Sequence, residues 1–205
     1  MTSFKTEQES FWAGQFGDDY ATRNRGAGWI AANTALFAKI FQRTRGIESV
    51  LEFGANIGLN LQAIRQLQPN ARLTAVEINA TAVEELKKLS GIEVFHESLL
   101  DFKARATHDF VLCKGVLIHL DPAALPTVYQ TLFESSRRYI CVAEYYSPSP
   151  VAIEYRGHAN KLFKRDFAGE LLKTFPQVRL LDYGFVYRGD PNFPQDDITW
   201  FLLEK

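Results

Sequence analysis

The chain has 205 residues, of which 46% are hydrophobic and 23% are charged, as is typical of a single globular domain. Its formal net charge is −1, so it lacks the excess of lysine and arginine that binding to DNA or RNA requires. It has no apolar run of membrane-spanning length and no signal-peptide pattern at its start, and we therefore expect a cytoplasmic protein that binds neither nucleic acid nor membrane.

The first part of the chain differs in composition from the rest. Residues 1–25 are a mixture of polar and aromatic side chains, and a helix is predicted over residues 29–42, where apolar side chains recur on one face. We treat residues 1–45 as an N-terminal segment and residues 46–205 as the main part of a single domain.

Strand-like and helix-like runs alternate from residue 49 onward. The predicted strands are 49–53, 73–78, 94–97, 110–114 and 139–144, and the predicted helices are 59–68, 80–89 and 122–136. The last helix has a clear start, because Asp121 can cap it and Pro122 suits its first position. This alternation predicts an α/β fold, with a parallel sheet covered by helices on both faces.

The alternation ends in the last forty residues. A helix is predicted over 167–175, after Asp166 as a plausible cap, and two strands follow at 178–186 and 197–203. A loop rich in Gly, Asp, Pro and Asn joins these strands, and no helix separates them. The sequence therefore predicts an antiparallel hairpin at the end of the sheet.

A glycine turn follows the first predicted strand. Residues 50–60 contain Glu52, Gly54, Asn56 and Gly58 in the pattern E-x-G-x-x-x-G, ahead of a helix. The dinucleotide fingerprint is G-x-G-x-x-G, which offers a helix N-terminus to a pyrophosphate. Here a carboxylate would repel a phosphate but suit a ligand with an ammonium or sulfonium charge. The pattern resembles the first motif of class I S-adenosylmethionine (AdoMet)-dependent methyltransferases.

A second acid strengthens this interpretation. Glu77 ends the next predicted strand, 23 residues after Gly54, at the distance from which an acid reaches the ribose hydroxyls in a βαβ unit. A carboxylate can accept hydrogen bonds from both hydroxyls of a vicinal diol. The spacing alone does not distinguish AdoMet from NAD; Glu52 and the missing third glycine favour AdoMet.

Longer strings resemble one narrower family, the pseudaminic acid biosynthesis-associated methylases, over nearly the whole chain. These strings are Phe11–Asp18, Gly54–Leu61, Lys114–His119, Ala143–Tyr146, Tyr155–His158, Phe163–Glu170 and Pro194–Phe201. The resemblance implies the class I methyltransferase (Rossmann-like) fold, with a seven-stranded, mostly parallel sheet and an antiparallel C-terminal hairpin strand. It also implies an acceptor in nonulosonic acid metabolism.

The resemblance further implies a set of cofactor contacts, in which the N-terminal segment folds over the site. The residues concerned are Tyr20, Arg23, Asn24, Glu52, Gly54, Asn56, Gly58, Glu77, Ile78, Ser98, Leu99 and Lys114. Arg23 or Lys114 would meet the carboxylate of AdoMet. Ser98 stands where many of these enzymes place an aspartate near the adenine amino group, a departure from the usual pattern.

Two histidines are candidates for removing the acceptor's proton. His119 is the leading one, because an ordinary histidine pKa lies near neutrality, with a structural role as the alternative; His158 is the second. The acceptor would contact Glu144, Tyr145, Tyr155, Arg156 and His158, within or near the locally basic stretch 156–165.

We interpret the chain as an AdoMet-dependent methyltransferase, with S-adenosylhomocysteine as the second product. It would act on oxygen or nitrogen of a small, anionic, sugar-type acceptor. A binding protein without turnover, and a methyltransferase for a macromolecule such as glycosylated flagellin, remain open alternatives. Cys113 and Cys141 read as free buried thiols, no cluster of metal ligands is apparent, and the oligomeric state stays open.

Overall fold

The computed structural model describes residues 4–205 and contains one sheet of seven strands, in the order β3-β2-β1-β4-β5-β9-β8. The strands are β1 (Ser49–Phe53), β2 (Arg72–Glu77), β3 (Ile92–His96), β4 (His108–Lys114), β5 (Ser136–Glu144), β8 (Arg179–Val186) and β9 (Ile198–Glu204). The first five are parallel, and β9 runs antiparallel to both β5 and β8. The predicted fold class is confirmed.

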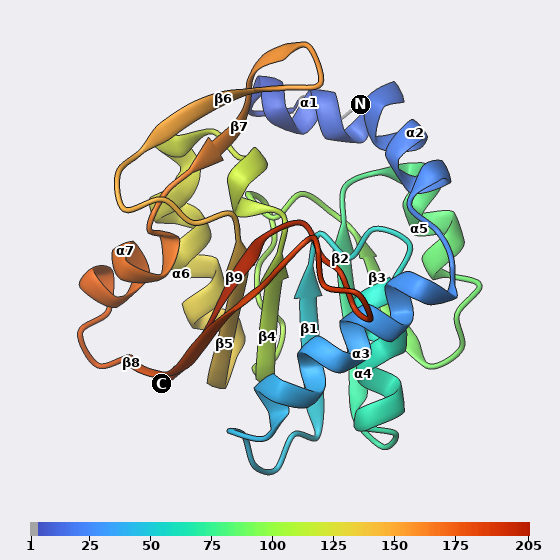
Figure 1. The fold of residues 1–205 in the computed structure, drawn as a ribbon, viewed down its shortest axis with the longest axis vertical. Helices are drawn as coiled ribbons and strands as arrows, with labels where there is room; N and C mark the ends of the chain where they lie inside the picture. The colour runs from blue at the N-terminus through green and yellow to red at the C-terminus, as the bar shows by residue number, and fades with distance from the viewer. Residues whose placement is uncertain (1–3) are drawn as a thin grey trace.

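Helices cover both faces of this sheet (Figure 1). They are α1 (Glu7–Ala13), α2 (Gln15–Arg23), α3 (Ala27–Phe41), α4 (Leu59–Leu67), α5 (Ala80–Leu86), α6 (Leu125–Ser135) and α7 (Phe167–Thr174), with short 3₁₀ helices η1 (Leu117–His119) and η2 (Pro122–Ala124). One hydrophobic cluster joins the sheet to α3 and α4, and a second joins the opposite face to α6 and α7. None of the helices in the described residues is long and apolar enough to cross a membrane.

The central strands are hydrophobic because both of their faces are buried. All five residues of β1 are buried; Val50 belongs to one core cluster, and Leu51 and Phe53 belong to the other. Each such side chain contributes about 1.5–3 kcal/mol on full burial. Glu52 is the exception in this run, since it is a carboxyl group with no exposed surface. An acid at such a position stabilises nothing by packing, which indicates a role in a site.

A two-stranded hairpin, β6 (Val151–Tyr155) and β7 (His158–Lys164), was not predicted from the sequence. Four of the five residues of β6 are exposed, so no alternation of buried and exposed side chains marks it. Arg156 and Gly157 form its turn with φ of 51° and 83°. Positive φ at both central residues is what a tight two-residue hairpin requires.

The hairpin and the first two helices lie above the carboxyl ends of the parallel strands (Figure 1). The polar contacts that join them include an ion pair between Lys161 and Glu7 and a hydrogen bond of 3.1 Å from Gln8 Nε2 to the carbonyl oxygen of Asn160. Segments more than 150 residues apart in sequence thus meet over the edge of the sheet where open α/β folds bind ligands.

Candidate functional site

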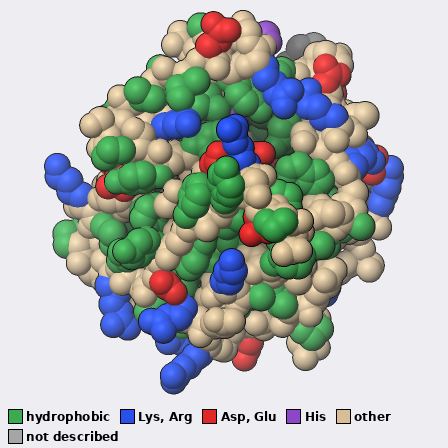
Figure 2. All heavy atoms as spheres, in the orientation of Figure 1, with side chains coloured by type: hydrophobic (Ala, Val, Ile, Leu, Met, Phe, Trp, Pro, Cys, Tyr) green, Lys and Arg blue, Asp and Glu red, His purple; other side chains and the backbone are tan. Residues whose placement is uncertain are grey.

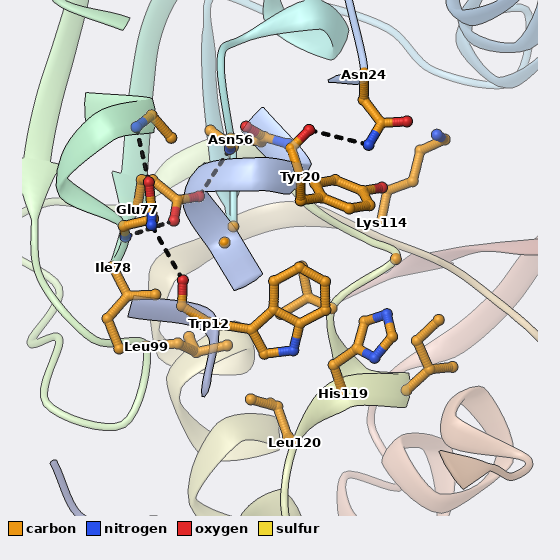
Figure 3. Close-up of a pocket in the computed structure, with 18 of the residues that line it drawn as sticks. Trp12, Tyr20, Asn24, Asn56, Glu77, Ile78, Leu99, Lys114, His119 and Leu120 are labelled. Carbon is orange, nitrogen blue, oxygen red and sulfur yellow. Dashed lines mark hydrogen bonds between the residues drawn. The ribbon is translucent and has the colours of Figure 1, made fainter. Parts of the chain in front are cut away.

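A cavity of about 340 Å³ lies at this edge, within the range of small-molecule sites. Its walls come from the loops after β1, β2, β3, β4 and β5, from α1, α2 and α3, from the turn of the β6–β7 hairpin and from the loop before β9. In Figure 3, Glu77 and Ile78 lie on one side of it and Lys114 and His119 on the other. In the space-filling view, acidic and basic side chains meet amid hydrophobic ones near the centre of this face (Figure 2).

The glycine turn after β1 forms part of the cavity wall. Gly54 lines the cavity with φ of 67°, and a Cβ there would come within 2.4 Å of Val116 Cγ2. Asn56 also lines it with a positive φ of 48°. Gly58 was predicted to contact the cofactor, but it lies outside the lining and packs at the start of α4 beneath Leu86. Its lack of a side chain serves helix packing.

Glu77 is buried at the end of β2 and lines the cavity. Its Oε2 accepts a hydrogen bond of 2.7 Å from the amide of Asn56, and its Oε1 accepts one of 2.8 Å from the amide of Asn79. Burial raises the pKa of this carboxyl, and these backbone N–H donors oppose the shift. Each oxygen retains a second lone pair, so the carboxylate can still accept two hydrogen bonds from a diol.

Glu52 lies directly beneath the cavity rather than in its wall. Its Oε1 accepts a hydrogen bond of 2.6 Å from Asn60 Nδ2, whereas Oε2 has no partner among residues 4–205. Burial raises the pKa of Glu52 to about 8, and the Asn60 hydrogen bond and the charge of Lys114 oppose this shift. Like Glu144, this carboxyl group holds its proton at neutral pH in the ligand-free protein, and its Oε2 is left for interaction with a ligand.

Polar atoms without partners gather around this one cavity. Four residues that line it have a buried side-chain atom with no hydrogen bond inside the described part of the chain: Trp12 Nε1, Asn56 Oδ1, Asn60 Oδ1 and Glu144 Oε2. Each such group costs about 1–3 kcal/mol if it stays unpaired, and native proteins contain few of them. Their concentration in one place indicates a polar ligand that both donates and accepts hydrogen bonds.

Lys114 lies at the end of β4 and lines the cavity. Burial lowers its pKa, and the charges of Glu52, Asp196 and Glu144 act in the opposite direction. Among the described residues it has no carboxylate within 4 Å, so its ammonium group is available to an anionic ligand. Asp196, from the loop before β9, also lines the cavity and was not predicted as a site residue.

Glu144 ends β5 and presents one free oxygen to the cavity. Its Oε1 accepts hydrogen bonds of 2.9 Å from the amides of Val116 and Leu117, while Oε2 is unpaired within residues 4–205. Burial raises the pKa of Glu144 to about 8 despite these donors. The carboxyl group therefore holds its proton at neutral pH in the ligand-free protein.

His119 lies in η1, is 7% exposed and faces Trp12 in Figure 3. It packs against the rings of Trp12 and Tyr155 at centroid distances of 4.6 and 4.9 Å. Its Nδ1 donates a hydrogen bond of 2.6 Å to the carbonyl oxygen of Lys161, so Nε2 is left as the acceptor of a neutral ring. Burial lowers its pKa to about 4. The expectation of a pKa near neutrality is therefore wrong.

Most of the predicted site residues line the cavity, but Arg23 and His158 lie outside the lining, as Glu52 and Gly58 do. The cavity lining includes Tyr20, Asn24, Gly54, Asn56, Glu77, Ile78, Ser98, Leu99, Lys114, His119, Glu144, Tyr145, Tyr155 and Arg156. Arg23 is exposed and stacks on Phe16 and Tyr20, outside that lining. His158 is exposed and packs on Phe11 and Phe16, which leaves it outside the lining as well.

Several lining residues were not identified from the sequence as binding groups. Glu9, Trp12, Asn33 and Asn60 belong to helices, where polar side chains ordinarily face solvent. The sequence did carry one sign of Glu9, because Thr6 and Glu9 have the spacing of a capping box. That motif predicts where a helix starts and says nothing about a cavity. In the described residues no group of His, Cys, Asp or Glu side chains is suited to a metal ion.

Comparison with known proteins agrees with this arrangement. Residues 50–138, from β1 into β5, match a family model described as a methyltransferase domain. No curated protein matches the chain at a significant level.

Solved methyltransferases share the architecture at low sequence identity. The plantazolicin methyltransferase BpumL in complex with SAH has 16% identity and a TM-score of 0.67, and the alignment covers 97% of this chain and 93% of that one. The Burkholderia thailandensis 1,6-didemethyltoxoflavin-N1-methyltransferase with S-adenosylhomocysteine has 17% identity, a TM-score of 0.70 and coverages of 96% and 86%. The magnesium protoporphyrin IX methyltransferase ChlM from Synechocystis PCC 6803 with bound SAM has 12% identity, a TM-score of 0.66 and full coverage of both chains, 100% each.

At these identities the likeness establishes the fold. The match to a methyltransferase domain over residues 50–138 covers less than half of the chain and agrees with that fold.

Proposed function

We propose that this protein binds AdoMet across the carboxyl ends of β1 and β2 and transfers its methyl group to oxygen or nitrogen of a small, anionic, sugar-type acceptor. The observation that carries the proposal is Glu77: a buried carboxyl group, fixed by two backbone amides, which still offers a free lone pair on each oxygen to the cavity. A ribose diol supplies the two donors that this arrangement lacks.

The remaining groups fit the other parts of AdoMet. Acceptor atoms of Glu52 and Asn60 without partners suit the ammonium group of its methionine part, and Lys114 suits the carboxylate beside it. Ile78 and Leu99 provide apolar surface for the base. On this proposal α1 and α2, within the N-terminal segment 1–45, form the cover of the cofactor site.

AdoMet, when bound, supplies a methyl group activated by the neighbouring sulfonium. The protein must then align the acceptor, exclude water and take up one proton. Trp12 and Tyr155 enclose His119 and limit water there. Because its ring is neutral at pH 7, Nε2 can accept the proton of an acceptor hydroxyl or amine, which becomes acidic as the methyl group arrives. Glu144, protonated at that pH, is better suited to donating a hydrogen bond.

The acceptor end combines positive charge with hydroxyl groups. Arg156, at the turn of the hairpin, lines the cavity, and its guanidinium lies 5.8 Å from the ring centroid of Tyr155. Among the described residues it has no carboxylate within 4 Å. Tyr20 and Tyr145 add phenolic groups to the same cavity. These features suit a carboxylated sugar, and the sequence resemblance supports a nonulosonic acid, such as pseudaminic acid, or its nucleotide-activated form.

Calorimetric titration tests the cofactor, and a transfer assay tests the acceptor. We expect micromolar binding of S-adenosylhomocysteine, no binding of NAD, and loss of binding in Glu77→Ala. Radiolabelled AdoMet is then supplied with free and nucleotide-activated nonulosonic acids, and with neutral sugars as controls. Failure of the folded protein to bind S-adenosylhomocysteine would contradict the proposed function. Binding without transfer to any small acid would favour an accessory protein or a macromolecular acceptor.

A further inference from the structure

The end of the cavity near Ser98 contains a carboxylate that comes from the other end of the sequence. Glu9, in α1, lines the cavity together with Ser98 and Leu99 and is only 4% exposed. The loop after β3 also has an acid in the lining, Glu97, but its carboxylate pairs with Arg105 at 2.8 Å, and the next residue is Ser98. The N-terminal helix therefore brings a second, more deeply buried acid to this loop.

Three donors fix the Glu9 carboxylate. Its Oε2 accepts hydrogen bonds from the amides of Lys5 and Thr6, at 2.6 and 3.1 Å, as part of the cap of α1. Its Oε1 accepts a hydrogen bond from the Ser98 hydroxyl, and that hydroxyl in turn accepts one of 3.0 Å from the amide of Leu100. Of about four lone pairs on an ionised carboxylate, one on Oε1 remains free.

Other contacts attach α1 to this loop independently of Glu9. Lys5 forms an ion pair with Asp101, and its Nζ donates a hydrogen bond of 3.2 Å to the carbonyl oxygen of Leu100. A change at Glu9 that preserves the helix cap therefore leaves α1 in contact with the loop. The binding role of Glu9 can be separated from a purely mechanical one.

The hydrogen-bonding pattern at this end matches one edge of adenine. The free lone pair of Glu9 Oε1 is an acceptor, and the backbone amides of Ser98 and Leu99 donate no hydrogen bond within residues 4–205. Adenine presents an amino donor next to a ring nitrogen acceptor. Hypoxanthine, the base of inosine, reverses both groups, since it has a carbonyl oxygen and a protonated ring nitrogen.

We propose that Glu9 recognises the adenine amino group of the cofactor, a contact that Ser98 cannot make as a carboxylate would. The proposal rests on the proposed function, because it requires an adenosine-containing ligand in this cavity. Glu9 is then a specificity-determining residue, and α1 contributes to the choice of base as well as to covering the site.

The test compares two ligands that differ only at this edge of the base. Titration of the wild type with S-adenosylhomocysteine and S-inosylhomocysteine should give a preference for adenine of about 100-fold. Glu9→Gln should reduce that preference to less than about tenfold, because an amide N–H₂ can donate to the inosine carbonyl. Glutamine also serves at this position of a capping box, so α1 keeps its start.

Two further variants make the comparison specific. Glu7→Gln, two residues earlier on α1 and paired with Lys161, should leave the preference unchanged. Ser98→Ala retains Glu9 but removes one donor that orients it, and should reduce the preference by about threefold.

A purely mechanical role for Glu9 predicts a different result: Glu9→Gln would weaken both ligands equally and leave their ratio unchanged, which would overturn the inference. Wild-type protein that binds S-adenosylhomocysteine without preferring it over the inosine analogue would overturn the inference and leave the proposed function standing. Absence of S-adenosylhomocysteine binding would overturn both.

Discussion

The side-chain amide nitrogen of Asn79 donates a hydrogen bond of 3.2 Å to the carbonyl oxygen of Trp12. The same residue donates its backbone N–H to Glu77 and caps α5 with its side-chain oxygen. It also donates to Asp18 in α2. One asparagine therefore links Glu77, the acid proposed to hold the ribose, to the helices proposed to cover it. A displacement of these helices should change the position of Glu77, and a change at Glu77 should affect the helices.

Gly17 tests this link. A Cβ at Gly17 would come within 1.9 Å of the Trp12 carbonyl oxygen and 2.8 Å of Asn79 Nδ2, so Gly17→Ala must displace α2. We expect S-adenosylhomocysteine to bind about tenfold more weakly, a cost of about 1.4 kcal/mol. Gly28→Ala in α3 is the control, since nothing lies within 4 Å of its added Cβ and affinity should be unchanged. Equal affinities for both variants would contradict the proposed cover.

Replacement of Glu77 by glutamine should weaken S-adenosylhomocysteine at least tenfold. The amide retains one acceptor oxygen and replaces the other with a donor, which opposes both the Asn79 amide and a ribose hydroxyl. A hydrogen bond to a charged group contributes about 1.5–3 kcal/mol, consistent with that loss. Glu84→Gln, an exposed acid on α5 paired with Lys87, serves as control and should bind normally in the same titration.

Glu52 should make the free protein less stable as pH rises. Its folded-state pKa, about 8, lies above the ordinary value of 4.5, so its contribution is fully present below pH 4.5 and is lost as pH rises through 8. The expected slope is at most about 1.4 kcal/mol per pH unit. Glu52→Gln should remove this slope and raise the Tm at pH 8, because the amide needs no proton and can donate to the unpaired Asn60 Oδ1.

The same variant should bind S-adenosylhomocysteine about tenfold more weakly, because a neutral amide cannot pair with an ammonium group. Thermal unfolding between pH 5 and 9 and titration at pH 7.5 measure the two effects. A stability profile parallel to that of the wild type would show that Glu52 is already ionised in the free protein.

The pH dependence of methyl transfer tests His119. With a pKa of about 4, its ring is neutral throughout the usual assay range, and kcat should therefore show no loss assignable to it between pH 6 and 7.5. His119→Asn, which can still donate to the Lys161 carbonyl oxygen, should retain cofactor affinity and lower kcat by about 10²-fold or more. Unchanged kcat in this variant would assign His119 a structural role.

Arg156→Gln should raise KM for an anionic acceptor about tenfold with little change in kcat, since the charge is proposed to act in binding rather than in transfer. The matched control is Arg43→Gln, an exposed arginine near Asp182 that follows α3 and lies outside the cavity lining. For an uncharged acceptor analogue, the two variants should have the same KM. A similar effect on both kinds of acceptor would remove the case for an anionic substrate.

The central strands could be predicted because a strand buried on both faces consists of a nearly continuous run of apolar residues. β1 was predicted with its observed bounds, Ser49–Phe53, and β2, β4 and β5 were predicted within a few residues. The helix predicted over 122–136 is instead divided into η2 and α6, since a 3₁₀ turn occupies its first three residues. This division depends on local hydrogen bonds, which cannot be predicted from the spacing of apolar residues.

Positions at the cavity could be predicted where a residue ends a parallel strand. Glu77, Lys114 and Glu144 could be assigned in this way, because the carboxyl ends of parallel strands share one edge. Glu9 could not, since its approach to Ser98 depends on a helix packing across 89 residues of sequence. The position of His158 could not be foreseen for a related reason: the hairpin was not predicted, and its register directs this side chain onto Phe11, outside the cavity lining.

The order of the strands has a consequence for synthesis on the ribosome. β9 is made after β8 but lies between β8 and β5, and Ile198 at its start lines the cavity. Until β9 emerges, β8 has no partner and β5 exposes an unpaired edge, the kind of surface on which chains associate wrongly. On a nascent chain that ends before residue 198 the cavity is incomplete, and a ligand cannot occupy it fully. Binding of cofactor can therefore stabilise the correct fold only after translation has passed that point.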